Sequence, residues 1–141
     1  MAAFVKCNQF VYNLGLKKID LENDSFKIAL TNTAMSAEDD GAYADFTDLT
    51  TAGGYTAGGN AAAGSWSRSG ATSTFVNTDP TVWTATAAGI GPFQYAVLYD
   101  DTPAAGADKC IVGWWNYGSG VTLASGETFT VDLAATTLTI A

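Results

Sequence analysis

The chain of 141 residues contains no histidine. This absence excludes nucleophile activation by Ser–His–Asp or Cys–His groups, and it excludes zinc sites with histidine ligands. The chain has only two cysteines, Cys7 and Cys110, which lie far apart and show no spacing typical of a metal site or a disulfide framework. We therefore expect two free, buried thiols, and no catalytic residue, cofactor or bound metal.

Charged residues are also scarce, at 14% of the chain against about 25% in ordinary globular proteins. The net charge of −8 argues against nucleic acid as a partner, because phosphate binding depends on Lys and Arg. Four of the six basic residues lie in the first 27 positions, whereas two basic and eleven acidic residues follow from position 28 onward. The sequence thus places a mildly basic N-terminal segment on an acidic body.

Long apolar runs are missing as well. No stretch approaches the roughly 18 apolar residues that a membrane span needs. Lys6 and Asn8 interrupt the apolar stretch near the N-terminus, which therefore does not resemble a signal peptide. We expect no membrane partner and assembly in a cytoplasm.

The N-terminal segment, residues 1–18, has a helical pattern. Phe4, Cys7, Val11 and Leu14 recur at helical spacing, and Gly15 suits a helix end. The pattern predicts a helix over residues 3–15. A helix of this length is marginal alone and must dock on something.

After this segment the apolar period changes from helical to two. In residues 24–31, Phe26, Ile28 and Leu30 alternate with more polar residues, which predicts a half-buried strand. Residues 32–61 are rich in Gly, Ala and Asp, and we expect a long excursion with at most short strands. Further strands are predicted over residues 65–68, 72–77, 92–100, 110–117, 121–123, 127–133 and 136–140. Short strands with regular turn signals predict one domain over residues 1–141, a β-sandwich or jelly roll.

Two acidic doublets, Asp39-Asp40 and Asp100-Asp101, are the candidates for acid–base or calcium chemistry. Both fall in predicted turns, where solvated carboxylates are the ordinary content. We expect them to be exposed and without a catalytic or metal-binding role.

The aromatic residues suggest contact with another molecule. Trp114 and Trp115 are adjacent in a predicted strand, so their rings should lie on opposite faces. The outward ring would need a cover, either a sugar, a loop or another subunit. Because aromatic residues are enriched in the cores of protein interfaces, we favour a subunit and expect a dimer or trimer.

Several segments resemble a family of small tailed-phage virion proteins. They are FVK (4–6), NQFV (8–11), KIALTNT (27–33), IGPFQYAVLY (90–99), IVGWWNYG (111–118) and GETFTVD (126–132). The resemblance implies a jelly-roll capsid decoration, or cement, protein that binds the outside of the phage head as an oligomer. The implied partners are the major capsid protein and further copies of the chain, and the implied location is the virion exterior.

We place the capsid and subunit contacts on the basic N-terminal segment, the Gly-rich excursion and the tryptophan pair. The residues of this hypothesis are Phe4, Lys6, Phe10, Lys17, Lys18, Gly54, Tyr55, Gly58, Trp114 and Trp115. It predicts that deleting residues 1–18 leaves a folded β domain that no longer decorates heads. The alternatives are a carbohydrate-binding or receptor-binding domain of a virion, and a tail-tube or head–tail joining subunit.

Overall fold

The computed structural model of the chain describes residues 2–102, 108–133 and 137–141. Its elements are β1 (Phe4–Lys6), α1 (Asn8–Gly15), β2 (Phe26–Thr31), the 3-10 turn η1 (Tyr43–Asp45), β3 (Asn60–Ala61), β4 (Gly64–Ser69), β5 (Thr72–Asn77), β6 (Trp83–Thr84), β7 (Ile90–Asp100), β8 (Ile111–Leu123), β9 (Thr128–Phe129) and β10 (Leu138–Ile140). The predicted class, mainly β with one short N-terminal helix, is confirmed.

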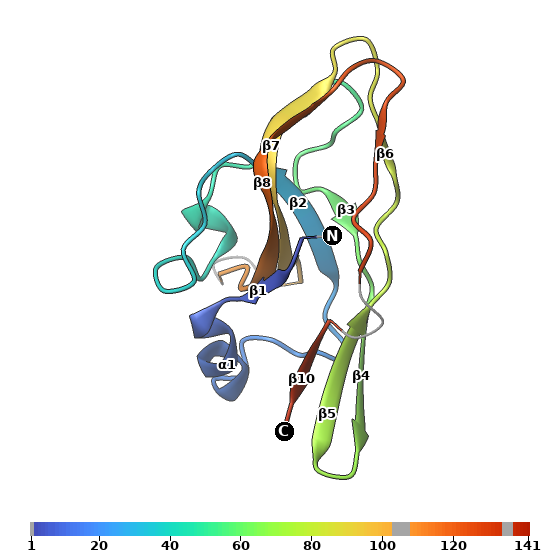
Figure 1. Cartoon of the computed structure of the whole chain (residues 1–141). Helices are drawn as coiled ribbons and strands as arrows, with labels where there is room; N and C mark the ends of the chain where they lie inside the picture. Colours follow the sequence, from blue (N-terminus) through green and yellow to red (C-terminus); the bar gives the residue numbers. More distant parts are fainter. Residues whose placement is uncertain (1, 103–107, 134–136) are drawn as a thin grey trace.

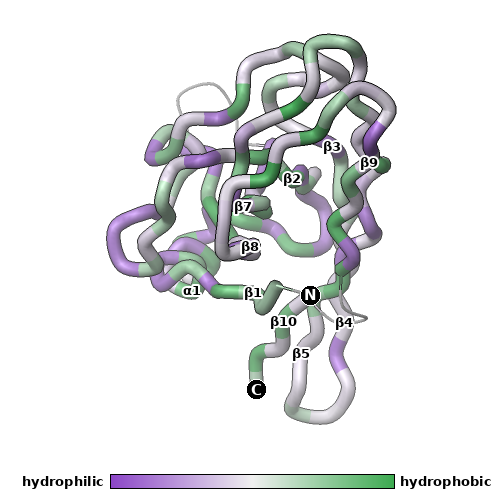
Figure 2. The backbone as a smooth tube through the Cα atoms, turned by 45° about the horizontal axis from the view of Figure 1, so that its top comes forward, coloured by the Kyte–Doolittle hydropathy of each residue, from purple (hydrophilic) through white to green (hydrophobic). Residues whose placement is uncertain are grey.

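The strands form three antiparallel sheets. The central sheet has the order β1-β8-β7-β2-β3, a second sheet has the order β10-β5-β4, and β6 pairs with β9. Figure 1 shows the central sheet between two layers, with α1 and the segment after β2 on one side and the smaller sheets on the other. Figure 2 shows hydrophobic stretches on the strands of the central sheet, where the core lies.

Both faces of the central sheet are covered, which changes the expected burial of β2. Phe26 meets Phe75 of β5 on one side, at 5.0 Å between ring centroids, and Tyr43 meets Tyr99 of β7 on the other side, at 4.7 Å. Ala29 is accordingly as inaccessible as the apolar residues that alternate with it. The prediction of a half-buried strand is wrong, because alternation shows which residues share a face but not whether the second face is covered.

The N-terminal segment differs from the prediction in its first turn. The helix begins at Asn8, and Phe4–Lys6 is instead an edge strand paired with Trp115, Trp114 and Gly113 of β8. Hydrogen bonding to an existing sheet edge outweighs the helical spacing of four apolar residues. The N-terminal segment therefore contributes β1 to the central sheet before α1 begins.

The excursion over residues 32–61 contains only η1 and β3 as regular structure, as predicted. The strands predicted over 65–68 and 72–77 are present as the hairpin β4–β5. The segment 121–123 is not a separate strand, since β8 continues to Leu123, and the strand predicted over 127–133 shrinks to Thr128–Phe129. Position 136, the first residue of the last predicted strand, lies outside the described residues.

A candidate docking surface on the N-terminal segment

The tryptophan pair does not need a cover from another molecule. Trp114 and Trp115 are 3% and 5% exposed within a single chain. The ring of Phe4, brought in by β1, lies 4.8 Å from the ring of Trp115 between centroids. The expectation that one ring points outward and waits for a sugar or a subunit is therefore wrong, because the chain's own N-terminal strand supplies the cover.

The helix α1 is held against the sheet by its buried face. Phe10 is fully buried, and so is Cys7, which precedes the helix. The backbone N–H of Cys7 donates to the carbonyl oxygen of Val112 at 3.0 Å, and its thiol donates to the carbonyl oxygen of Asp40 at 3.0 Å. Cys7 and Cys110 are free and buried, as predicted, and burial raises the pKa of both thiols.

The outward face of this segment carries apolar side chains. Of the described residues, five large hydrophobic ones are exposed, and four of them lie between positions 5 and 16: Val5, Val11, Tyr12 and Leu16, with Tyr12 the most exposed at 68%. Tyr12 and Leu16 are one helical turn apart, and the N–H of Leu16 donates to the carbonyl oxygen of Tyr12 at 3.0 Å. Exposed apolar groups gathered in this way mark an interaction surface more often than scattered ones do.

Three lysines lie close to these apolar groups in the sequence. Lys6 on β1 and Lys17 and Lys18 after the helix are all exposed. We define the docking surface as Val11, Tyr12, Leu16, Lys17 and Lys18. Of the residues predicted to make contacts, the three lysines are therefore accessible, whereas Phe10 is a core residue and Phe4 is half-buried under β8.

The helix end fixes the position of the two lysines. Lys17 has a φ of 58°, and the N–H groups of Lys17 and Lys18 donate to the carbonyl oxygens of Leu14 and Asn13. This is the Schellman arrangement, in which glycine is usual at the left-handed position. The helix ends at Gly15, as predicted, and the left-handed residue that reverses the chain falls two positions later on Lys17.

The left-handed Lys17 gives a stability prediction. Replacing Lys17 with glycine should stabilise the fold by about 1 kcal/mol, because glycine adopts a positive φ without a steric penalty. Thermal unfolding of Lys17→Gly against Lys18→Gly measures this, since Lys18 does not occupy the left-handed position. An equal loss of stability in both variants would contradict the assignment of strain to Lys17.

The Gly-rich excursion is packed into the fold and is not a free loop. Tyr55 is 2% exposed, and its hydroxyl accepts from the N–H of Leu30 at 3.0 Å and donates to Asp48. Burial, followed by this bond to Asp48, raises the pKa of Tyr55. The N–H of Gly58 also donates to Asp48. The Asp48 carboxylate thus links Tyr55 and Gly58 within the excursion by hydrogen bonds.

Gly54 illustrates how closely this loop approaches the body. It has a φ of 97°, and a Cβ at this position would lie 2.2 Å from the carbonyl oxygen of Thr84. Thr84 belongs to β6, whereas α1 lies beside the opposite end of the central sheet in Figure 1. The structure therefore does not bring Gly54, Tyr55 and Gly58 together with the N-terminal lysines.

The acidic doublets are structural. Asp40 accepts from the N–H of Ser36 at 2.6 Å and Asp39 accepts from the Ser36 hydroxyl at 2.8 Å, so both hold their own turn. Asp101 bridges Lys27, at 2.8 Å, and Lys109. Burial of Asp101 raises its pKa, but the hydrogen bonds and charges of the two lysines outweigh burial and hold the pKa below its usual value.

Asp100 is not the solvated turn residue that the sequence suggests, because it ends β7 and is 1% exposed. Burial raises its pKa to about 7, and a hydrogen bond with the Asp24 carboxylate adds to the effect. The N–H of Thr102 donates to Asp100 at 2.9 Å. No group of three or more His, Cys, Asp or Glu side chains within the described ranges is arranged to hold a metal ion.

This buried carboxyl group predicts a pH dependence of stability. The folded chain holds the Asp100 proton more tightly than the unfolded chain, whose carboxyl has a pKa near 3.8, so stability should fall as pH rises from about 4 to about 7. The loss should be on the order of 3 kcal/mol. Thermal melts of Asp100→Asn should lack this decline, whereas Asp39→Asn should retain it. A wild-type melting temperature that rises through this window would contradict the prediction.

Comparison of the chain with known protein families, curated proteins and solved structures finds no match. Within the described residues, no helix is both long and apolar enough to cross a membrane.

Proposed function

We propose that the chain is a structural virion protein that binds the outer surface of a phage capsid, reinforces contacts between major capsid subunits and associates with itself. The observation that carries the proposal is the docking surface, an exposed apolar face with Lys17 and Lys18 beside it, of which Lys18 lies 4.0 Å from Asp108. The resemblance of segments along the chain to small virion proteins supports the same function. The proposed location is the capsid exterior.

The apolar side chains and the lysines of the docking surface would contribute differently to binding. Burial of Val11, Tyr12 and Leu16 would supply most of the affinity, at about 25 cal/mol per Å² of apolar area. Exposed ion pairs are worth only about 0–1 kcal/mol each, so Lys17 and Lys18 would orient the docking and favour an acidic partner surface. The acidic remainder of the chain would face solvent.

The alternative of sugar binding loses its main support. It relied on an outward tryptophan of the pair Trp114-Trp115, and both rings are buried. No observation on the described residues favours a tail-tube or head–tail joining subunit over the capsid exterior.

Co-sedimentation tests the proposal. Purified chain is mixed with heads of the phage that encodes it, from which the chain has been removed, and the pellet is assayed for saturable binding. We expect saturation at a fixed number of copies per head, and no binding to isolated tails. Binding to tails alone, or to neither particle, would contradict the proposed function.

A further inference from the structure

Among the described residues, the outer edge of the hairpin β4–β5 is a long strand edge without a partner. β4 is the outer strand of its sheet, in the order β10-β5-β4. At six residues it is the longest edge strand in the described part of the chain, and Ser65 and Ser67–Ser69 are exposed. Figure 1 shows the hairpin projecting from the body of the molecule. Proteins normally blunt such an edge with proline, inward charges or a bulge, because it offers a template for another strand.

The register of the hairpin shows which backbone groups are free. Ser69 pairs with Thr72 across a two-residue turn, and pairing continues without a shift to Gly64. Because backbone groups alternate in direction along an antiparallel strand, those of residues 65, 67 and 69 point to β5. The N–H and C=O groups of Gly64, Trp66 and Arg68 therefore point outward along the free edge.

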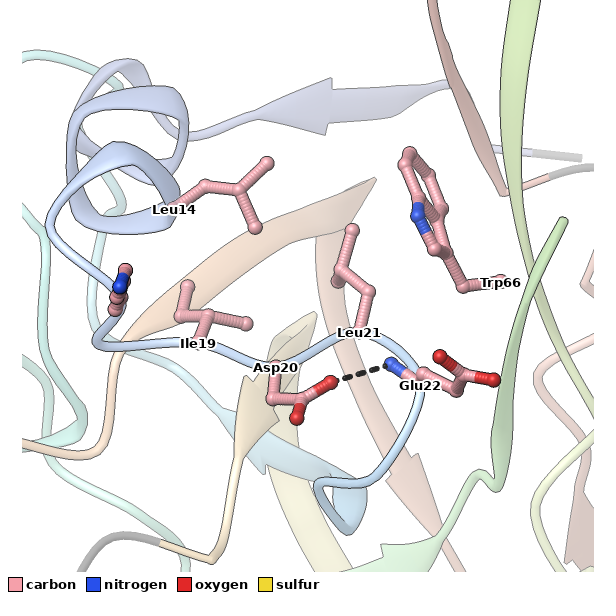
Figure 3. Close-up of a pocket in the computed structure, with 7 residues that line it drawn as sticks. Leu14, Ile19, Asp20, Leu21, Glu22 and Trp66 are labelled. Atoms are coloured by element: carbon pink, nitrogen blue, oxygen red, sulfur yellow. Dashed lines mark hydrogen bonds between the residues drawn. The ribbon is translucent and has the colours of Figure 1, made fainter. Parts of the chain in front are cut away.

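A groove lies beside this edge, on the side of the sheet that faces the body. Its volume is about 510 Å³, and Leu14, Ile19, Leu21 and Trp66 point toward one another across it (Figure 3). Lys17, Asp20 and Glu22 line it as well. Asp20 is occupied by its own turn, since it accepts from the N–H of Glu22 at 3.0 Å. Glu22, next to Trp66, is exposed, and its carboxylate makes no hydrogen bond to any described residue.

The hairpin is also where this acidic chain can approach a copy of itself with least repulsion. Residues 60–78 contain no Asp or Glu, although the chain has 14 of them, and Arg68 is the only charged residue in this stretch. Figure 2 shows most of the hairpin near neutral hydropathy. Like-charge repulsion therefore opposes self-association over most of the surface but not along β4.

We propose that a second copy of the chain docks on the β4 edge, antiparallel, so that β4 of the two copies pair about a twofold axis at Trp66. An antiparallel pair of identical edges is self-complementary, since each outward donor faces an acceptor of the other copy. Centring the pair on Trp66 engages all three outward residues: Trp66 faces Trp66 of the second copy, and Gly64 faces Arg68 of the second copy. The three-stranded sheets of the two copies, each with the order β10-β5-β4, then become one continuous sheet of six strands.

This register also suits the side chains. Residues 64, 66 and 68 share the face that lines the groove, because side chains alternate along a strand. Arg68 of the second copy would therefore lie on the groove side of the sheet, where Glu22 is available. The paired Trp66 rings form a cross-strand aromatic contact next to the apolar wall of the groove. The inference concerns the self-association part of the proposed function, and it is tested without phage heads so that the two can fail separately.

Sedimentation equilibrium of the full chain, with a proline variant, gives the first test. Arg68→Pro removes an outward N–H but no hydrogen bond to β5, so the hairpin should remain folded. We expect a concentration-dependent dimer in wild type and in Arg68→Ala, and a dissociation constant at least tenfold higher in Arg68→Pro. A monomer at every concentration would overturn the proposal, as would an unchanged dimer in a folded Arg68→Pro.

Disulfide trapping gives a second test that does not depend on proline. In the proposed register the two residues at position 66 face each other at a Cα separation of about 5.5 Å, within the range of a disulfide, whereas those at position 68 are about four residues apart. Under oxidation, Trp66→Cys should form a covalent dimer and Arg68→Cys should not. The wild-type chain, whose two native cysteines are buried, serves as the control for background disulfide formation. The reverse pattern, or equal trapping at both positions, would overturn the register.

Discussion

Deleting residues 1–18 is expected to unfold the domain, not to leave a folded β core. The deletion removes β1, which pairs with β8 and covers Trp115, and it removes the fully buried Cys7 and Phe10. Truncating one buried phenylalanine typically costs about 3–5 kcal/mol, and a whole domain has only about 5–15 kcal/mol of stability. Losing these groups together should exceed what the remaining residues can supply.

Two point variants of adjacent residues separate this effect from a general sensitivity of α1. Phe10→Ala should lower the free energy of unfolding by about 3 kcal/mol or more, whereas Val11→Ala, at a side chain that is 45% exposed, should change it by less than about 0.5 kcal/mol. Chemical denaturation followed by tryptophan fluorescence measures both. A cooperative transition of the truncated chain, at wild-type stability, would show that β1 and α1 are dispensable for folding.

The second large effect is expected in head binding. Tyr12→Ala should weaken binding roughly 30-fold, since truncating an aromatic side chain at the centre of an interface costs about 2 kcal/mol or more. Leu16→Ala should weaken it in the same direction. Both residues are exposed in the free chain, so neither variant should disturb folding.

Val82 offers a matched control for this experiment. It is 45% exposed, as is Val11, but it lies far along the chain, next to β6. Val11→Ser should weaken binding to heads while Val82→Ser leaves it unchanged. If the two serine variants bound equally well, exposed apolar area in general, and not the docking surface, would be responsible.

The mainly β fold could be predicted from the sequence because its signals are local. The hairpin β4–β5 follows from alternation on both sides of a turn at Gly70, and both strands appear within one residue of their predicted ends. The start of α1 could not be predicted in this way, because the choice between helix and strand at Phe4 depends on the edge of β8, more than 100 residues away in the sequence.

Part of the candidate docking surface could be predicted from the sequence. The lysines are exposed as their charge implies, but the apolar half of the docking surface was missed because the expected helix had the wrong phase. The predicted helix placed Val11 on its buried face together with Phe4. A helix that begins at Asn8 instead buries Phe10 and Asn13 and leaves Val11 and Tyr12 exposed. The burial of both tryptophans and of Asp100 depends on long-range packing, which alternation within one strand does not report.

Cryo-electron microscopy of decorated heads tests the central claim most directly. The map should place the outer face of α1, with Val11, Tyr12 and Leu16, against the capsid shell, and the acidic remainder of the chain toward solvent. A map in which these three side chains face solvent while another surface of the chain contacts the shell would contradict the proposed docking. So would a map in which the chain is absent from the capsid exterior.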